Sequence, residues 1–352
     1  MKMMMCIIHP SPFYPLTNLR FYHTNCEIGT EGLGTVIFPA LDPNGPIRNL
    51  NSVIDIFNIH FNLENQTLKN IRQWDAQKYD KVSWLQERWG QDLIDGIKWN
   101  PTYQVIMDAG CGTGRVTKIL AQKVGTKGTI YAVDVDPNMV SQAKLNLSSF
   151  ENVHVIQSDI GNVSLPVKVN VIFSNAVLHW ISDHRRLFGH FWELLTNALF
   201  AEKKSAGLLI AQCGGHGNLD NVRRIINQII KLDDFESHFH DWAEPWYFAK
   251  PEDTEELLRE IGFENIRVFL SDGTTNFSDR KRYSDFVSTV IMMPYLENLP
   301  NEQLKHRLLK LFLDRVEEMK LDWTLDYVRL NIVAECITPF SQSPSSATSS
   351  LD

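Results

Sequence analysis

A glycine-rich turn holds the residues whose types and spacing have the clearest chemical meaning. Its key residues are Asp108, Gly110, Gly112 and Gly114. The apolar run 105–107 before the turn predicts a buried strand, and the residues from Arg115 onward predict a helix. Glycine lets a ligand approach the backbone because it has no Cβ, and the first N–H groups of a helix are free to bind an electron-rich group. The sequence therefore predicts a ligand-binding turn between a strand and a helix.

The spacing of the glycines distinguishes between kinds of ligand. The dinucleotide fingerprint requires a third glycine three residues after the second, but Arg115 occupies that position. The carboxylate of Asp108 would repel a pyrophosphate, whereas it would tolerate an ammonium or a sulfonium group. Asp134 ends the next expected strand, about 20 residues past the glycines, where a carboxylate can accept hydrogen bonds from both hydroxyls of a ribose.

These segments resemble motif I and the ribose-binding motif of class I S-adenosylmethionine (SAM) methyltransferases. The matching stretches are Asp-Ala-Gly-Cys-Gly-Thr-Gly at 108–114 and Val-Asp-Val-Asp-Pro-Asn-Met at 133–139, and the stretches 157–160 and 171–180 agree with them. Within the class, the run 174–180 and the layout of the C-terminal part are most similar to the trans-aconitate methyltransferase group, which methylates small molecules. The resemblance covers roughly residues 71–336.

The resemblance implies a SAM site with defined residues. The cofactor-binding positions that it implies are Asp108, Gly110, Gly112, Gly114, Asp134, Asp136, Met139, Asp159, Ile160 and Asn175. In that arrangement the glycines and Asp108 surround the methionine part of SAM, Asp134 binds the ribose, and Asp136 and Met139 lie beside it. Asp159 and Ile160 contact the adenine, and Asn175 lies near the methionine end. Asp159 and Asn175 equally fit residues that cap turns.

Methyl transfer from a sulfonium is an in-line displacement, so the protein need not supply a nucleophile. His179 is the one histidine that the motifs place near the reacting centre, either as a general base or as a structural histidine. The candidates for acceptor binding are Trp74, Tyr79, Trp180, Trp246, Tyr247 and Arg329. The aromatic candidates equally fit packing residues. Arg329 matches an arginine of the trans-aconitate group, where a cation can meet a substrate carboxylate.

Composition excludes several classes of partner. The 352-residue chain has a formal net charge of −8 and a pI near 5.8, which disfavours nucleic acid and anionic membranes as partners. The five cysteines include no Cys-x-x-Cys pair, which favours a reducing cytosol and argues against zinc. The His-x-His-Asp run at 238–241 has no second ligand cluster, so we expect no metal. No apolar run is long enough to span a membrane.

Strands that alternate with helices predict an α/β fold, a doubly wound, mostly parallel seven-stranded sheet with helical lid and cap segments. The expected strands are 104–108, 129–134, 153–156, 169–174, 207–213, 265–270 and 327–335. Core helices are expected at 116–124, 138–147 and 185–199, and helices of the cap at 284–296 and 301–319. Trp84, Leu85 and Trp89 are expected to pack the lid against the sheet.

Five segments describe the expected organisation of the chain. They are a proline-containing N-terminal extension (1–70), a helical lid (71–100), a methyltransferase domain (101–336) with cap helices at about 214–250 and 281–322, and a serine-rich tail (337–352).

We therefore expect a cytosolic SAM-dependent methyltransferase whose partner is a small-molecule acceptor. The aromatic content favours N- or O-methylation of a hydrophobic specialised metabolite. One alternative is a carboxyl O-methyltransferase of a small organic acid, as the subgroup resemblance implies. An alternative of another class is a SAM-binding sensor or partner subunit without catalysis.

Overall fold

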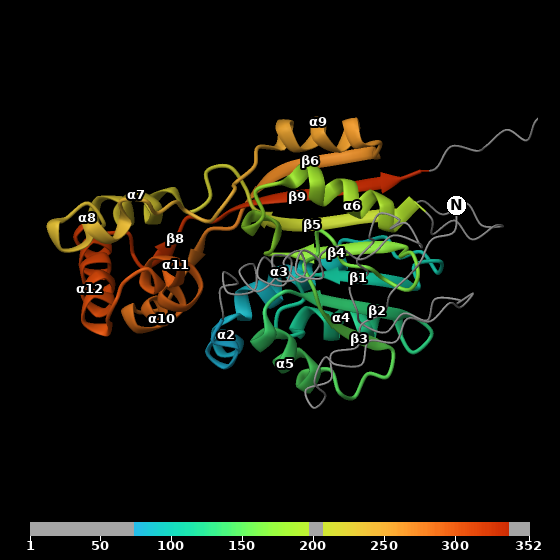
Figure 1. Ribbon diagram of the computed structural model, residues 1–352, viewed down its shortest axis with the longest axis horizontal. Helices are drawn as coiled ribbons and strands as arrows, with labels where there is room; N and C mark the ends of the chain where they lie inside the picture. Colours follow the sequence, from blue (N-terminus) through green and yellow to red (C-terminus); the bar gives the residue numbers. More distant parts are fainter. Residues whose placement is uncertain (1–73, 197–206, 338–352) are drawn as a thin grey trace, which may run out of the picture. The chain divides into compact units, whose positions relative to one another are not determined.

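The computed structural model describes residues 74–196 and 207–337 (Figure 1). The expectations for the N-terminal extension 1–70 and for the tail beyond residue 337 lie outside these described residues. The same holds for the end of the helix expected at 185–199, which is described from His184 to Thr196 as α6.

One seven-stranded sheet forms the centre of the described part, in the order β3-β2-β1-β4-β5-β9-β6. The strands are β1 (Val105–Ala109), β2 (Thr129–Asp134), β3 (Val153–Gln157), β4 (Val171–Asn175), β5 (Gly207–Gly214), β6 (Glu264–Asp272) and β9 (Val328–Cys336). The first five are mutually parallel, and β9 runs antiparallel between β5 and β6. The expected fold class is therefore confirmed, and each expected strand lies within two residues of an observed one at both ends.

Helices cover both faces of this sheet. On one face lie α3 (Trp84–Asp95), α4 (Arg115–Val124) and α5 (Pro137–Asn146), and on the other lie α6 and α9 (Pro251–Ile261). Neighbouring residues of one strand point to opposite faces of the sheet, and both are apolar. In β1, Ile106 packs against α3 and α4, and Met107 packs against α6 on the other face. Such a run, buried on both faces, is what a parallel sheet between two helical layers requires.

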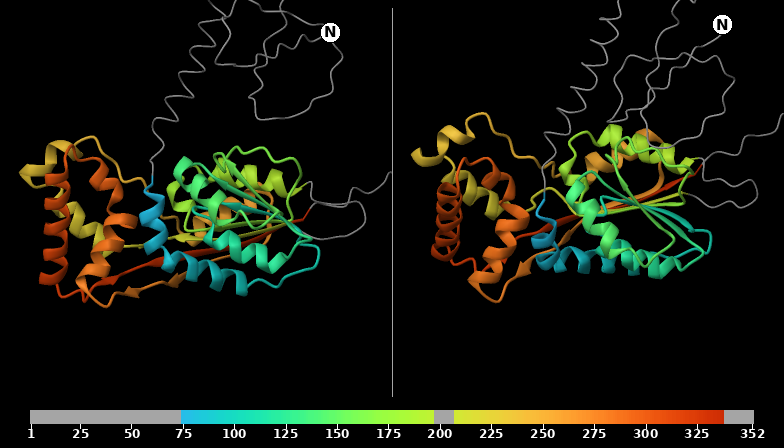
Figure 2. Two further views of the ribbon diagram at one scale, coloured as in Figure 1. Left: turned by 90° about the horizontal axis from the view of Figure 1, so that it is seen from below. Right: turned by 60° about the horizontal axis from the view of Figure 1, so that its bottom comes forward.

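A helical cap has a hydrophobic core of its own at the carboxyl edge of the parallel strands (Figures 1 and 2). It contains α7 (Asp220–Ile229), α8 (Asp233–Phe239), α10 (Arg280–Phe286), α11 (Met293–Glu297), α12 (Glu302–Glu318) and the short strand pair β7 (Thr275–Asn276) and β8 (Thr324–Leu325). The single helix expected at 284–296 is interrupted by a π-helical turn, Val287–Ile291, in which Met292 N–H donates to the Val287 carbonyl. Pro294 has no N–H to continue the helical hydrogen bonds of the preceding turn, so a new helix, α11, begins at this point.

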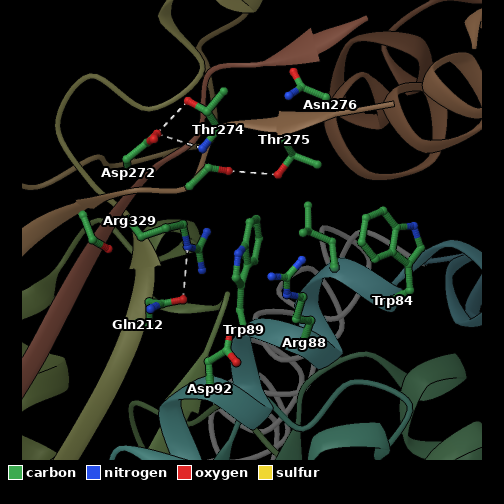
Figure 3. A pocket seen from close by; sticks show the side chains of 13 residues that line it. Trp84, Arg88, Trp89, Asp92, Gln212, Asp272, Thr274, Thr275, Asn276 and Arg329 are labelled. Atoms are coloured by element: carbon green, nitrogen blue, oxygen red, sulfur yellow. Dashed lines mark hydrogen bonds between the residues drawn. The ribbon is translucent and has the colours of Figure 1, made fainter. Parts of the chain in front are cut away.

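The lid consists of two helices separated by Ser83 alone, α2 (Ala76–Val82) and α3. Asp80 of α2 accepts hydrogen bonds from Thr113 Oγ1 at 2.7 Å and from Arg115 Nε at 2.9 Å. The lid is thus fixed to the glycine turn. Two packing expectations were wrong. Leu85 is buried, but in the core of the cap and not against the sheet. Trp84 is 45% exposed, because it lies on the side of α3 that faces a surface recess (Figure 3).

Asp136 joins the lid to the sheet. It is 2% exposed and caps α5 by accepting from the backbone N–H groups of Asn138 and Met139, both at 2.8 Å. Its other oxygen accepts from the backbone N–H of Trp74 at 2.8 Å. One carboxylate therefore fixes both the start of α5 and the start of the lid.

We expect Asp136→Ala to lower the free energy of unfolding by about 1–3 kcal/mol, because it removes a helix cap and leaves buried N–H groups unpaired. Asp136→Asn retains an acceptor oxygen and should lose less. Urea unfolding followed by circular dichroism measures both variants. Equal losses in the two would show that the hydrogen bonds of this side chain are not what matters.

Candidate active site

The three turn glycines serve different purposes. All have positive φ, 82° at Gly110, 54° at Gly112 and 84° at Gly114, a region that L-residues rarely adopt. A Cβ at Gly110 would lie 2.2 Å from Val177, and one at Gly114 would lie 2.7 Å from Leu147. At Gly112 a Cβ would meet nothing within 4 Å. Gly110 and Gly114 are therefore required by packing, whereas Gly112 borders open space that a ligand can fill.

The carboxylate of Asp134 lies directly beside this open position. It accepts from the Gly112 N–H at 2.8 Å and from the Asp136 N–H at 2.9 Å. Burial raises the pKa of Asp134, while these two backbone hydrogen bonds oppose the increase. The fold thus brings together the open glycine and the carboxylate that the sequence singled out.

Asp108 lies deeper, at the end of β1. It is 2% exposed, and it accepts from Thr117 Oγ1 of α4 at 2.6 Å. Burial raises the pKa of Asp108 to about 7, against the opposing effect of the Thr117 hydrogen bond. Its side chain is therefore not a fixed negative charge at neutral pH.

Other expected cofactor residues have structural partners. Asp136 and Met139 form the start of α5, and Met139 is 4% exposed. Asp159 is exposed and accepts from the Gly161 N–H at 2.8 Å, and Ile160 is part of the sheet core. Each of these side chains is thus already engaged in a cap, a turn or the core.

Asn175 ties β4 to the lid. Its Nδ2 donates to the Gln86 carbonyl of α3 at 2.8 Å. Its Oδ1 is buried, and no residue of the described ranges donates to it. An unpaired buried acceptor at the carboxyl end of β4 is available to a ligand.

His179 is held in one orientation. Its Nδ1 accepts from the Gly214 N–H at 3.3 Å, and its ring lies 5.9 Å from that of Phe248. Burial, with a smaller contribution from the positive charge of Arg329, lowers the pKa of His179 to about 3. A neutral imidazole with so low a pKa is a poor proton acceptor, so the geometry favours the structural interpretation over a general base.

Aromatic side chains from separate segments meet beside His179. The aromatic cluster comprises, in order of contact, Tyr79, Trp74, Trp180, Trp246 and Phe248, with ring centroids 5.3–5.9 Å apart between successive members. Burial, and then the negative charge of Asp134, raises the pKa of Tyr79. The cluster is therefore within electrostatic range of the carboxylate beside the open glycine.

Tyr247 lies apart from the cluster. It is 39% exposed, and its ring packs edge-on against His184 at 4.9 Å. Residues 246–248 belong to no helix or strand, but Trp246 and Phe248 stack with each other while the residue between them points away. Side chains alternate in direction along an extended segment, and this pattern could have identified Phe248 as the partner of Trp246 in place of Tyr247.

Arg329 is a buried cation that pairs with no carboxylate of the described residues. It is 3% exposed, its Nε donates to Gln212 Oε1 at 3.4 Å, and its guanidinium lies 4.1 Å from the ring centroid of Trp89. Burial lowers the pKa of Arg329 to about 10, so it stays charged at neutral pH. Its Nη2 has no acceptor among the described residues.

A cluster of charges at the lid was not predicted from the sequence. Arg115 forms ion pairs with Asp80 and Glu87. An arginine at the place of a fingerprint glycine was the available signal, because a cation there needs acidic partners. No group of three metal-ligating side chains occurs in 74–196 or 207–337, and no helix of these ranges could cross a membrane.

Parts of this chain are similar in sequence to known methyltransferases. Residues 103–264 match the methyltransferase domain family. Malonyl-[acyl-carrier protein] O-methyltransferase 1 of Ilyobacter polytropus is 35% identical over 121 residues, which is 34% of this chain and 44% of that protein. Trans-aconitate 2-methyltransferase of Escherichia coli O7:K1 is 25% identical over 247 residues, 70% of this chain and 88% of that protein.

Among solved structures, phosphoethanolamine N-methyltransferase 2 of Haemonchus contortus, in complex with SAM, has a TM-score of 0.44 and 17% identity. The match covers 72% of this chain and 52% of that one.

The titration of Asp108 gives a testable pH dependence. Folding raises the pKa of Asp108 from 3.8 to about 7, so the folded protein keeps a proton that the unfolded chain releases between these values. This contribution to stability is complete below about pH 4 and is lost as the pH rises towards 7. Asp108→Asn does not titrate, so between pH 5 and pH 8 its unfolding free energy should gain about 2–3 kcal/mol relative to wild type.

Urea unfolding at the two pH values measures this difference, and Asp92→Asn, which changes an exposed aspartate of α3, is the control. Parallel pH profiles for wild type and Asp108→Asn would contradict the assignment.

Proposed function

We propose that this chain, a member of the SAM-dependent methyltransferases, transfers a methyl group from SAM to a small-molecule acceptor in the cytosol. The observation that carries the proposal is the open position at Gly112 beside the carboxylate of Asp134, with the aromatic cluster within electrostatic range of that carboxylate. A cofactor site and an acceptor site side by side are what a group transfer requires.

The residues at the turn fit SAM. The open face of Gly112 leaves room for the cofactor close to the backbone, and the Asp134 carboxylate can accept hydrogen bonds from ribose hydroxyls. The unpaired Oδ1 of Asn175 is a further buried acceptor at the same edge of the sheet. When bound, SAM supplies a methyl group already activated by its sulfonium.

The remaining task of the protein is to position the reactants and exclude water. The ion pairs of Asp80 and Glu87 with Arg115 hold the lid over the turn. The aromatic cluster closes the acceptor side with large apolar rings. Alignment of two bound reactants can lower a barrier by about 7–11 kcal/mol. The neutral, low-pKa His179 supports a reaction in which no protein group removes a proton.

The aromatic cluster supports a hydrophobic metabolite as the acceptor, methylated on nitrogen or oxygen. Flat rings bury large areas of an apolar ligand and orient it by edge and face contacts. The rings of Trp74 and Trp180 meet edge to face at 5.7 Å. A side chain at the start of the lid therefore contacts one from the segment after β4. Acceptor binding and lid position are therefore coupled.

A small carboxylic acid is the second candidate, favoured by Arg329. A buried guanidinium with an unpaired Nη2 can bind a carboxylate strongly in a site with little water. A carboxylate acceptor also needs no general base. The relatives named as trans-aconitate and malonyl-[acyl-carrier protein] methyltransferases are consistent with an acid.

Label transfer tests the proposal. The purified protein is incubated with SAM carrying an isotopically labelled methyl group and with a metabolite extract, and mass spectrometry locates the label. We expect label in one small molecule, and its structure distinguishes an apolar acceptor from a carboxylic acid. Label in macromolecules alone would contradict the proposal, and intact SAM binding with no label anywhere would indicate a non-catalytic sensor.

Gly112→Ala and Gly125→Ala form a matched pair for the cofactor site. Both glycines have positive φ, and an added Cβ at either would meet nothing within 4 Å. Only Gly112 borders Asp134. We expect Gly112→Ala to weaken SAM binding at least tenfold in isothermal titration calorimetry, and Gly125→Ala to change it less than twofold. Similar affinities for the two variants would place SAM elsewhere.

A further inference from the structure

The carboxylate of Glu244 accepts hydrogen bonds from three side chains of the cap. They come from Arg223 Nε at 2.8 Å, Asn227 Nδ2 at 3.1 Å and the Tyr295 hydroxyl at 2.9 Å, and Arg223 Nη2 binds the same oxygen as Nε. The donors belong to α7 and α11, whereas Glu244 belongs to the segment 242–250, which is neither helix nor strand. Glu244 therefore joins two cap helices to an otherwise irregular segment.

This environment keeps Glu244 charged at neutral pH. Burial raises the pKa of Glu244, but the hydrogen bonds from Arg223 and Tyr295 outweigh burial, so the pKa lies below its usual value. The Glu244 side chain is 17% exposed, so solvent screens the ion pair less than it screens a pair on the open surface. A guanidinium that donates through two N–H groups is also fixed in orientation.

Side chains of the segment 242–250 alternate in direction. Glu244, Trp246 and Phe248 are two residues apart, and the rings of Trp246 and Phe248 stack at 5.9 Å, while the ring of Tyr247 lies apart from them. The Tyr247 N–H donates to the His179 carbonyl at 2.8 Å. A shift of the segment by one residue would turn both stacked rings away, so an anchor at Glu244 determines which rings enter the aromatic cluster.

Two of the side chains that bind Glu244 also contact these rings. The guanidinium carbon of Arg223 lies 5.3 Å from the ring centroid of Phe248, and the ring of Tyr295 lies 6.1 Å from that of Trp246. Tyr295 is fully buried, so its hydroxyl would be left without an acceptor if Glu244 were removed. The position of both rings is thus coupled to the carboxylate through direct contacts.

We propose that Glu244 is a positioning residue for the methyl acceptor. Through Arg223 and the cap helices it holds Trp246 and Phe248 against Trp180, and in this way it determines the shape of the acceptor site. The inference rests on the proposed function, because it takes the aromatic cluster as the place where the acceptor binds. Glu244 acts through its neighbours and takes no part in the chemical step.

Fluorine NMR of the full-length protein, labelled with 5-fluorotryptophan, tests the position of Trp246 without any methyl transfer. Trp246→Phe and Trp99→Phe assign two resonances, and Trp99, which packs in the core between α3, α4 and the sheet, is the reference. We expect Glu244→Ala to shift or broaden the Trp246 resonance and to leave that of Trp99 in place. The matched control Glu255→Ala removes a carboxylate paired with an arginine of the same helix, α9, and should move neither.

Kinetics with the acceptor that label transfer identifies test the effect on binding. We expect Glu244→Ala to raise the KM for the acceptor about tenfold or more, and to change kcat less, because misplaced rings no longer fit the acceptor. SAM affinity in isothermal titration calorimetry should change less than about twofold. Glu244→Gln keeps an acceptor for the Tyr295 hydroxyl and should restore part of the loss. Arg223→Lys keeps the charge but not the planar donor group, so it should resemble Glu244→Ala.

Three results would overturn the proposal: an unmoved Trp246 resonance in Glu244→Ala, equal shifts of the Trp246 and Trp99 resonances, or an unchanged KM for the acceptor. If Glu244→Ala does not fold, Glu244→Gln and Arg223→Lys provide the same comparisons. An absence of label in any small molecule contradicts the proposed function alone, because the NMR measurement does not depend on turnover.

Discussion

The hydrogen bond from the Gly112 N–H to the carboxylate of Asp134 is the interaction on which the candidate site depends. It joins the turn after β1 to the end of β2, and it keeps an acidic side chain at a half-buried position where burial alone would favour its neutral form. The bond requires the backbone of the turn to adopt positive φ, so it requires glycine. Asp136 donates its N–H to the Asp134 carboxylate, and its own carboxylate caps α5 and accepts from the Trp74 N–H at the start of the lid.

The sheet and the turn could be predicted because local signals determine them. Apolar runs buried on both faces identified β1, β2, β4 and β5, and the alternating glycines identified the place where β1 ends. Periodicity did not predict the break within 284–296, because the π-helical turn there depends on Pro294 and on packing in the cap. Trp84 was placed wrongly because one helix face can border either a sheet or a recess, and only the fold decides which.

The site was predictable only in part for a similar reason. A motif indicates which residues lie near one another, but not which hydrogen bonds their side chains already make. Asp159 and Asn175 are at the expected strand ends, yet one closes a turn and the other anchors α3. Arg115 shows the opposite case, since its partners Asp80 and Glu87 lie some thirty residues earlier and no local pattern connects them.

The position of β9 has a consequence for biosynthesis. This strand, the last one described, lies between β5 and β6, and it pairs Gly207 with Cys336. During synthesis, the edge of β5 that pairs with β9 therefore remains unpaired until about 120 further residues have been translated. Arg329 arrives on that same strand, so a truncated nascent chain lacks both the cation and the closed sheet. The yield of folded protein should thus depend more on complete translation and on chaperones than the yield of a protein whose strands pair in sequence order.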